Sequence, residues 1–78
     1  MTNTREIIAA NVRAAIARSG KKQRELVPLL GIRQETLSLK LNGRRSFVGE
    51  ELAIIASATD TTPGALIEGA APVLPKFF

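Results

Sequence analysis

Residues 23–43, QRELVPLLGIRQETLSLKLNG, predict two short helices joined by a tight turn. Apolar residues recur at helical spacing in both halves of this stretch: Leu26, Leu29 and Leu30, then Leu37 and Leu41. Between the two groups, Gly31 tolerates the left-handed backbone at which many helices end. Helices this short are not stable by themselves, so we expect both of them to pack on a third apolar surface.

The second of these helices has a predicted exposed face. On a helical wheel, Leu39 lies almost opposite Leu37 and Leu41, so we expect it to face solvent. A single exposed leucine is ordinary, but polar side chains surround this one: Gln34, Glu35, Ser38 and Asn42. Amide, hydroxyl, carboxylate and aliphatic groups together suit the base edges of a DNA major groove. Two short helices with a prominent second one form the helix-turn-helix that reads DNA.

Dispersed residues in this stretch keep the order and spacing of a known family: Gln23, Leu26, Gly31-Ile32, Thr36-Leu37-Ser38 and Leu41-Asn42-Gly43. On these residues, positions 6 to 68 resemble the lambda-repressor-like helix-turn-helix family of phage repressors, Cro-type proteins and related small bacterial regulators. The resemblance implies that Gln23 braces Gln34 and touches a phosphate. It further implies that Gln34, Glu35 and Leu39 reach bases, and that Asn42 with Gly43 approaches the DNA backbone.

The chain departs from this family at both helix starts. Lys22 and Arg33 occupy positions where a serine or threonine usually caps the helix, a contact worth about 1 kcal/mol. A cation at a helix N-terminus is mildly unfavourable unless a phosphate lies nearby, although neutral surface drift would also explain both residues. Pro28 lies in the middle of the first short helix, where we expect it to bend or tighten the chain.

Positive charge is concentrated around the two helices. The segment from Arg18 to Arg45 has eight basic and two acidic residues, a net charge of +6, whereas the rest of the chain has three basic and five acidic residues, a net charge of −2. A basic segment is often only a solvated face. Its coincidence with the predicted helix-turn-helix favours nucleic-acid binding. The eight basic residues are Arg18, Lys21, Lys22, Arg24, Arg33, Lys40, Arg44 and Arg45.

Length and composition argue against several other classes of protein. The 78 residues suffice for one small domain with a modest core. The sequence has no cysteine and no histidine, which removes thiolate and imidazole zinc sites and the usual nucleophile–base pairs. We therefore expect a protein that is not an enzyme and that uses no metal and no cofactor. The sequence contains no signal-like leader and no long apolar span, so we expect a cytoplasmic protein without membrane contact.

The remaining segments predict a helical scaffold. Three further helices are expected: one from about Thr4 to Ser19 that ends at Gly20, one from near Gly49, and a short one that begins at Pro63 after Thr62 and ends by Gly69. Their apolar stripes are Ile8, Val12 and Ile16, then Leu52, Ile55 and Ala56, then Leu66 and Ile67. We also expect Phe47 to fill the core where the chain turns back.

The C-terminal residues are a separate segment. Two prolines in GAAPVLPKFF prevent a regular helix, yet the segment is too apolar for a typical solvated tail. Three roles fit it equally well: folding back on its own domain, joining two subunits of a homodimer, or docking on another protein. The residues expected to make these contacts are Val73, Leu74, Phe77 and Phe78.

Together these observations predict an all-α protein, with a compact five-helix lambda-repressor-like DNA-binding domain over residues 1–69 and a short apolar C-terminal tail over residues 70–78. The predicted function is sequence-specific binding to a double-stranded DNA operator, as a small phage or prophage repressor or a Cro-like regulator. Bases are expected to meet Gln34, Glu35, Ser38 and Leu39, and phosphates Lys22, Gln23, Arg33, Asn42, Arg44 and Arg45. Two alternatives are an antitoxin-like protein-interaction module with autoregulatory DNA binding and a helical domain that has lost DNA binding.

Overall fold

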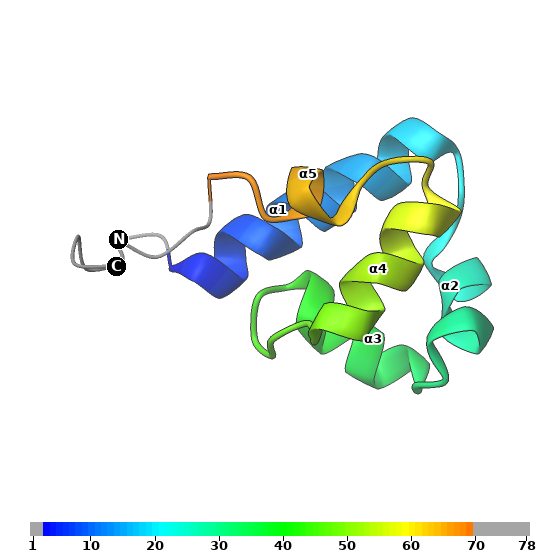
Figure 1. Ribbon diagram of the computed structural model, residues 1–78. Coiled ribbons are helices and arrows are strands. Elements are labelled where there is room, and N and C mark those ends of the chain that lie inside the picture. Colours follow the sequence, from blue (N-terminus) through cyan, green and yellow to red (C-terminus); the bar gives the residue numbers. More distant parts are fainter. Residues whose placement is uncertain (1–2, 70–78) are drawn as a thin grey trace.

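The structure, a computed structural model, describes residues 3–69, and throughout this range it is helical with no β-strand. Its five helices are α1 (Thr4–Ser19), α2 (Gln23–Leu30), α3 (Gln34–Leu41), α4 (Gly49–Ala58) and α5 (Pro63–Leu66) (Figure 1). The predicted all-α class and the expected helix positions are thereby confirmed for this range. The predicted tail contacts Val73, Leu74, Phe77 and Phe78 lie outside the described residues. No helix within 3–69 is both long and apolar enough to cross a membrane.

The helices pack in a continuous ring of contacts rather than on one common helix. Helix α1 packs against α3 and α5, while α2 contacts α3 and α4, and α4 contacts α5 (Figure 1). The side chain of Asn11 fastens α5 to α1, because its Nδ2 donates to the carbonyl oxygens of Leu66 at 3.0 Å and Glu68 at 2.8 Å. The two short helices therefore both pack on neighbouring helices, α2 on α3 and α4 and α3 on α1 and α2, as their length requires.

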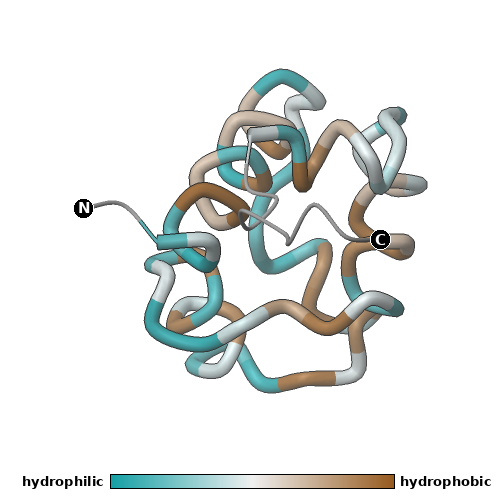
Figure 2. Tube along the Cα trace, turned by 60° about the vertical axis from the view of Figure 1, so that its left-hand side comes forward, coloured by the Kyte–Doolittle hydropathy of each residue, from teal (hydrophilic) through white to brown (hydrophobic). Residues whose placement is uncertain are grey.

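The core draws on all five helices. Hydrophobic and hydrophilic residues alternate along the chain trace (Figure 2), and each helix supplies at least one residue to the buried cluster. Phe47 packs against the core from the loop before α4, as predicted. The buried cluster consists of Val12, Ala15, Ile16, Leu26, Leu37, Leu41, Leu52, Ile55, Ala56 and Leu66.

Helix α1 begins with a reciprocal cap that the sequence analysis missed. Oδ1 of Asn3 accepts from the backbone N–H of Glu6 at 2.9 Å, and Oε1 of Glu6 accepts from the backbone N–H of Asn3 at 3.1 Å. An acid three residues after an N-cap asparagine is the signal that would have revealed it. The predicted cap of α5 is confirmed, since Oγ1 of Thr62 accepts from Ala65 N–H at 3.2 Å.

Three expectations about α2 and α5 need correction. Leu29 is 54% exposed rather than part of the buried stripe. On the helical wheel it lies about 60° from Leu26 and about 100° from Leu30, on the side away from the core. Helix α2 stays α-helical through Pro28, which excludes the tightening that was one of the two expected outcomes, while the bend stays a prediction. Ile67 is not in α5 but is its C-cap residue, 42% exposed, because the helix closes at Leu66.

Burial predicts opposite outcomes for two leucines of α3. Leu37 is fully buried, so Leu37→Ala should lower the free energy of unfolding by about 2 to 5 kcal/mol through the cavity it leaves. Leu39 is 38% exposed, and Leu39→Ala should change stability by less than about 1 kcal/mol. Urea unfolding of both variants measures the difference. Equal destabilisation by the two substitutions would show that α3 does not turn Leu37 to the core and Leu39 to solvent.

Candidate nucleic-acid interface

Helix α3 presents one face to the core and the opposite face to solvent. Leu37 and Leu41 are buried at 0% and 2% exposure, while Leu39 is 38% exposed, as the helical wheel predicts. The exposed face also carries the side chains of Gln34, Glu35 and Ser38. Helix α3 packs on α1 and α2, and its outer polar face remains exposed to solvent.

Every predicted DNA-contacting residue within the described range is exposed. The set occupies the starts of α2 and α3, the outer face of α3, and the loop that follows α3. None of these side chains is used to fill the core. The set consists of Lys22, Gln23, Arg33, Gln34, Glu35, Ser38, Leu39, Asn42, Arg44 and Arg45.

The starts of α2 and α3 are joined by a side-chain contact. Nε2 of Gln34 donates to Oε1 of Gln23 at 3.3 Å, which is the contact that the family resemblance implies. A primary amide has two N–H groups and an acceptor oxygen, so this bond leaves Gln34 one N–H and its carbonyl oxygen for a further partner. Both glutamines are exposed, and the contact holds Gln34 at the outer edge of α3.

Neither helix start has the side-chain cap that is usual at this position. Lys22 and Arg33 are the N-cap residues of α2 and α3, and neither side chain accepts a hydrogen bond from the first turn. At α2, Glu25 compensates in part, because its Oε1 accepts from the backbone N–H of Lys22 at 2.8 Å. The sequence analysis missed this acid, although its position three residues after the N-cap is a known signal.

The C-terminal end of α3 closes in a tight left-handed turn. Gly43 has φ of +76°, and its N–H donates to the carbonyl oxygen of Lys40 at 3.1 Å. The N–H of Arg44 donates to the carbonyl oxygen of Leu39 at 2.9 Å, which completes the Schellman pattern of paired hydrogen bonds. The turn directs the chain away from the helix axis, and Arg44 and Arg45 follow it as exposed residues.

Arginines of α1 complete the end of α3. Nη1 of Arg13 donates to the carbonyl oxygen of Leu41, the last residue of the helix. Nη1 of Arg5 donates to the carbonyl oxygen of Arg44 at 3.4 Å. A cation at a helix C-terminus is favourable because that end carries partial negative charge. Sequence reasoning missed both contacts, since they join residues 28 and 39 positions apart in the chain.

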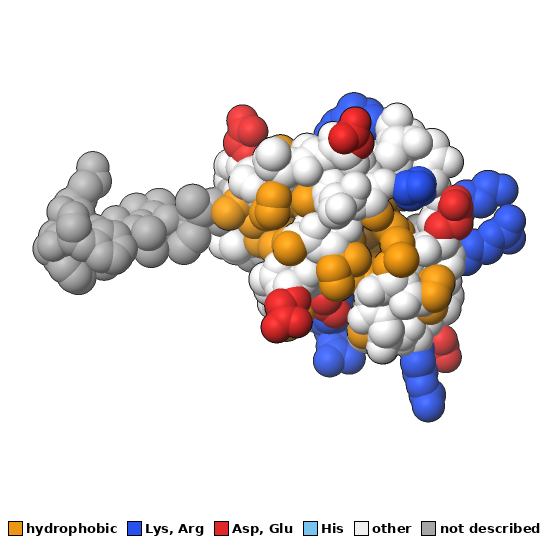
Figure 3. Space-filling view, turned by 45° about the vertical axis from the view of Figure 1, so that its right-hand side comes forward, with side chains coloured by type: hydrophobic (Ala, Val, Ile, Leu, Met, Phe, Trp, Pro, Cys, Tyr) orange, Lys and Arg blue, Asp and Glu red, His pale blue; other side chains and the backbone are white. Residues whose placement is uncertain are grey.

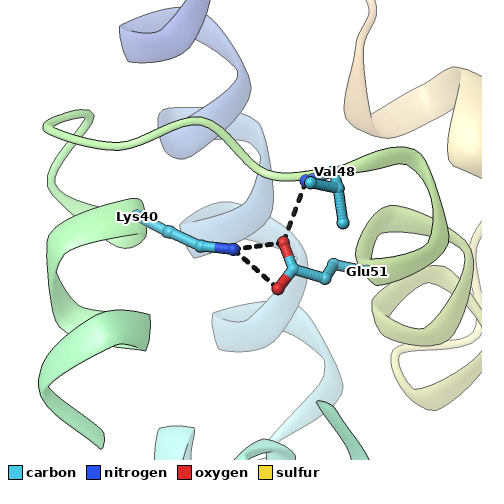
Figure 4. Close-up of polar contacts among 3 residues, drawn as sticks. All are labelled: Lys40, Val48 and Glu51. Atoms are coloured by element: carbon cyan, nitrogen blue, oxygen red, sulfur yellow. Dashed lines mark hydrogen bonds and ion pairs between the residues drawn. The ribbon is translucent and has the colours of Figure 1, made fainter. Parts of the chain in front are cut away.

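Lys40 does not contribute to the exposed positive charge of this surface, contrary to the count made from the sequence. It is counted among the basic residues of the Arg18–Arg45 segment, but it is 6% exposed and lies in the interior. Its Nζ is 2.5 Å and 2.6 Å from the two carboxylate oxygens of Glu51 in α4 (Figure 4). The helical spacing explains this, because Lys40 follows Leu37 by three residues and so lies on the buried side of α3. The other basic residues of the segment are exposed: Arg18, Lys21, Lys22, Arg24, Arg33, Arg44 and Arg45.

No protein-family model matches the chain, and comparisons with curated proteins and with solved structures find no match either. The resemblance to lambda-repressor-like proteins therefore stays a prediction that rests on the residues quoted for it.

Two glycines of the same backbone conformation test the closing turn of α3. Gly43→Ala places a Cβ 3.1 Å from Cγ and 3.2 Å from Cα of Glu6, whereas at Gly31, with φ of +68°, a Cβ meets nothing within 4 Å. Both alanines pay the left-handed penalty of about 1 to 2 kcal/mol. Gly43→Ala should lose clearly more stability than Gly31→Ala in urea unfolding, because only Gly43 lies against another helix. Equal losses would show that the turn does not pack on α1.

Proposed function

We propose that this protein is a sequence-specific double-stranded-DNA-binding regulator of transcription, a small repressor or Cro-like protein of phage or prophage type. In this proposal it is not an enzyme, and it acts in the cytoplasm by occupying an operator and blocking polymerase. The observation that carries the proposal is the outer face of α3, which is polar, unburied and flanked by exposed basic residues at both ends. The short α2 and α3 joined at Gly31 support a helix-turn-helix.

The dimensions and chemistry of α3 suit a major groove. Eight residues of helix are about 12 Å long, comparable with the groove width of about 12 Å. Gln34 keeps an N–H and a carbonyl oxygen free, which are the groups that pair with adenine. Leu39 can contact a thymine methyl group, and Glu35 can accept from a cytosine amino group. Ser38 can donate or accept at either kind of base pair.

Phosphate contacts would fix the register of α3 in the groove. Lys22 and Arg33 stand at the helix starts, where backbone N–H groups and the helix dipole also favour an anion. Arg44 and Arg45 lie beyond the other end of α3, so basic groups bracket the reading face. Gln23 and Asn42 supply neutral hydrogen bonds to the backbone between them. Contacts of this type position the protein, whereas the contacts to base edges select the sequence.

A single α3 offers only a few base contacts, which favours recognition by two copies. Helix-turn-helix proteins commonly place two recognition helices on half-sites about 34 Å apart, one turn of B-DNA. We propose a homodimer on an operator with matching two-fold symmetry. Such pairing raises affinity because the second subunit binds its half-site without a further loss of translational freedom.

One observation favours a second candidate function, an antitoxin-like protein-interaction module whose DNA binding is autoregulatory. Hydrophobic side chains extend across the face of the molecule shown in Figure 3, while the Lys and Arg side chains lie mainly at its edge. Exposed apolar side chains are common in partner-binding surfaces. The large hydrophobic residues exposed in the described range are Leu29, Leu39, Val48, Ile54 and Ile67.

Salt dependence tests DNA binding directly. The logarithm of the duplex association constant should fall linearly with the logarithm of salt concentration, with a slope of about −0.9 for each phosphate contacted. Arg44→Ala/Arg45→Ala should make that slope less steep by up to about 1.8 and weaken binding to all sequences alike. Fluorescence anisotropy with labelled duplexes between low and moderate salt gives both quantities. If the wild-type protein binds no duplex at low salt, the interaction module replaces the regulator as the function.

Base reading has a separate test once an operator is selected from random duplexes. Gln34→Ala should cost about 1 to 3 kcal/mol of discrimination at one base pair, because the amide loses its partner there. The salt slope should stay at the wild-type value, since no phosphate contact is removed. Competition between operator and mutated operator measures the discrimination. Arg24→Ala is a matched control, because Arg24 is exposed in α2 and lies outside the predicted contacts. The discrimination of this variant between operator and mutated operator should equal that of the wild type.

A further inference from the structure

The ion pair between α3 and α4 is the buried polar feature that the proposed DNA contacts leave unexplained. The side chains of Lys40 and Glu51 are only 8% and 9% exposed. Removing two charges from water is costly, and well-packed neutral residues of similar volume are often as stabilising as a buried pair. Stability alone is therefore a weak reason for this pair, and its geometry suggests another one.

Glu51 holds two elements at once. Its two carboxylate oxygens accept from Nζ of Lys40, near the end of α3, and its Oε1 also accepts from the backbone N–H of Val48 at 2.9 Å (Figure 4). Val48 is the N-cap residue of α4. One carboxylate thus ties the last turn of α3 to the first turn of α4. The chain between these two turns is the loop of residues 42–48.

This loop carries two of the proposed phosphate contacts. Arg44 and Arg45 are exposed within it, and its first residues are already fixed by the left-handed turn at Gly43. Glu51 fixes the other end through Val48. Helix α3 packs mainly on α1 and α2, so this ion pair is a direct polar link from α3 to α4. Arg5 also holds the carbonyl oxygen of Arg44, and Phe47 packs against the core, so the ion pair is one of three contacts that set the direction of the loop arginines.

We propose that Lys40 and Glu51 are positioning residues for DNA binding: the buried pair sets the 42–48 loop so that Arg44 and Arg45 flank the outer face of α3. The inference rests on the proposed function and adds a specific role for two residues that touch no DNA. The pair acts through the loop arginines, and its loss changes binding even where the fold is retained.

The test variant is Lys40→Met/Glu51→Gln. It removes the pair without changing the net charge, and glutamine keeps an oxygen that can accept from Val48 N–H. The variant should be folded by circular dichroism. Its duplex affinity at moderate salt should be about tenfold lower, and its salt slope less steep by about 0.9 to 1.8, the share of one or two phosphate contacts. A pair that served only stability would change the melting temperature and leave the slope of the folded protein unchanged.

A double-mutant cycle shows whether the pair acts through the loop. In a background of Arg44→Ala/Arg45→Ala, the Lys40→Met/Glu51→Gln change should cause no further loss of affinity, because the contacts it displaces are already gone. Additive losses would overturn the proposal. Ser57→Ala is the control: Ser57 is exposed in α4 outside the Arg18–Arg45 segment, the substitution leaves the net charge unchanged, and affinity and slope should equal those of the wild type.

A second variant keeps the proposal falsifiable if the first one fails to fold. Glu51→Asp retains both charges but shortens the side chain by one methylene, so it cannot reach Lys40 and Val48 together. The folded variant should show a salt slope less steep by about one unit. An unchanged slope in Glu51→Asp would overturn the positioning role while the wild-type protein still binds duplex. Absence of duplex binding by the wild type would instead overturn the proposed function itself, so the two failures are distinguishable.

Discussion

Burial of Leu37 and Leu41 is the constraint on which the arrangement of the interface depends. These two side chains fix the rotation of α3 about its own axis, and that rotation decides which residues remain in solvent. In a chain of 78 residues the core is small, so each buried leucine contributes a large share of the favourable free energy. A change in the rotation of α3 would expose a core leucine and bury a polar side chain in the same step.

Rotation alone does not place a short helix, and polar contacts from distant parts of the chain fix the ends of α3. At its start, Gln34 contacts Gln23 of α2. At its end, Arg13 of α1 binds the last carbonyl group, and Glu51 of α4 binds Lys40. Three other helices therefore hold α3 at both ends. A helix held in this way loses little conformational entropy on binding, which favours affinity and a defined register.

The sequence predicted the elements that depend on local signals and missed contacts that depend on folding. Helix bounds, the Thr62 cap and the exposure of Leu39 follow from periodicity and helix-end preferences, which act over a few residues. The Arg13 contact with Leu41 was not predictable, because no local pattern relates residues 28 positions apart. Leu29 was misplaced for a different reason: the spacing of α2 permits two neighbouring apolar faces, and only the packing of α2 against α3 and α4 decides between them.

Lys40 shows how a charge count changes when the fold is known. Its spacing from Leu37 placed it on the buried side of α3, so periodicity contained the information that the count ignored. The buried pair removes one positive charge from the Arg18–Arg45 segment and one negative charge from the rest of the chain. The net charges become +5 instead of +6 and −1 instead of −2. The Arg18–Arg45 segment therefore stays positive and the rest of the chain negative. The remaining basic side chains of the segment are exposed, so they can attract a polyanion at the protein surface.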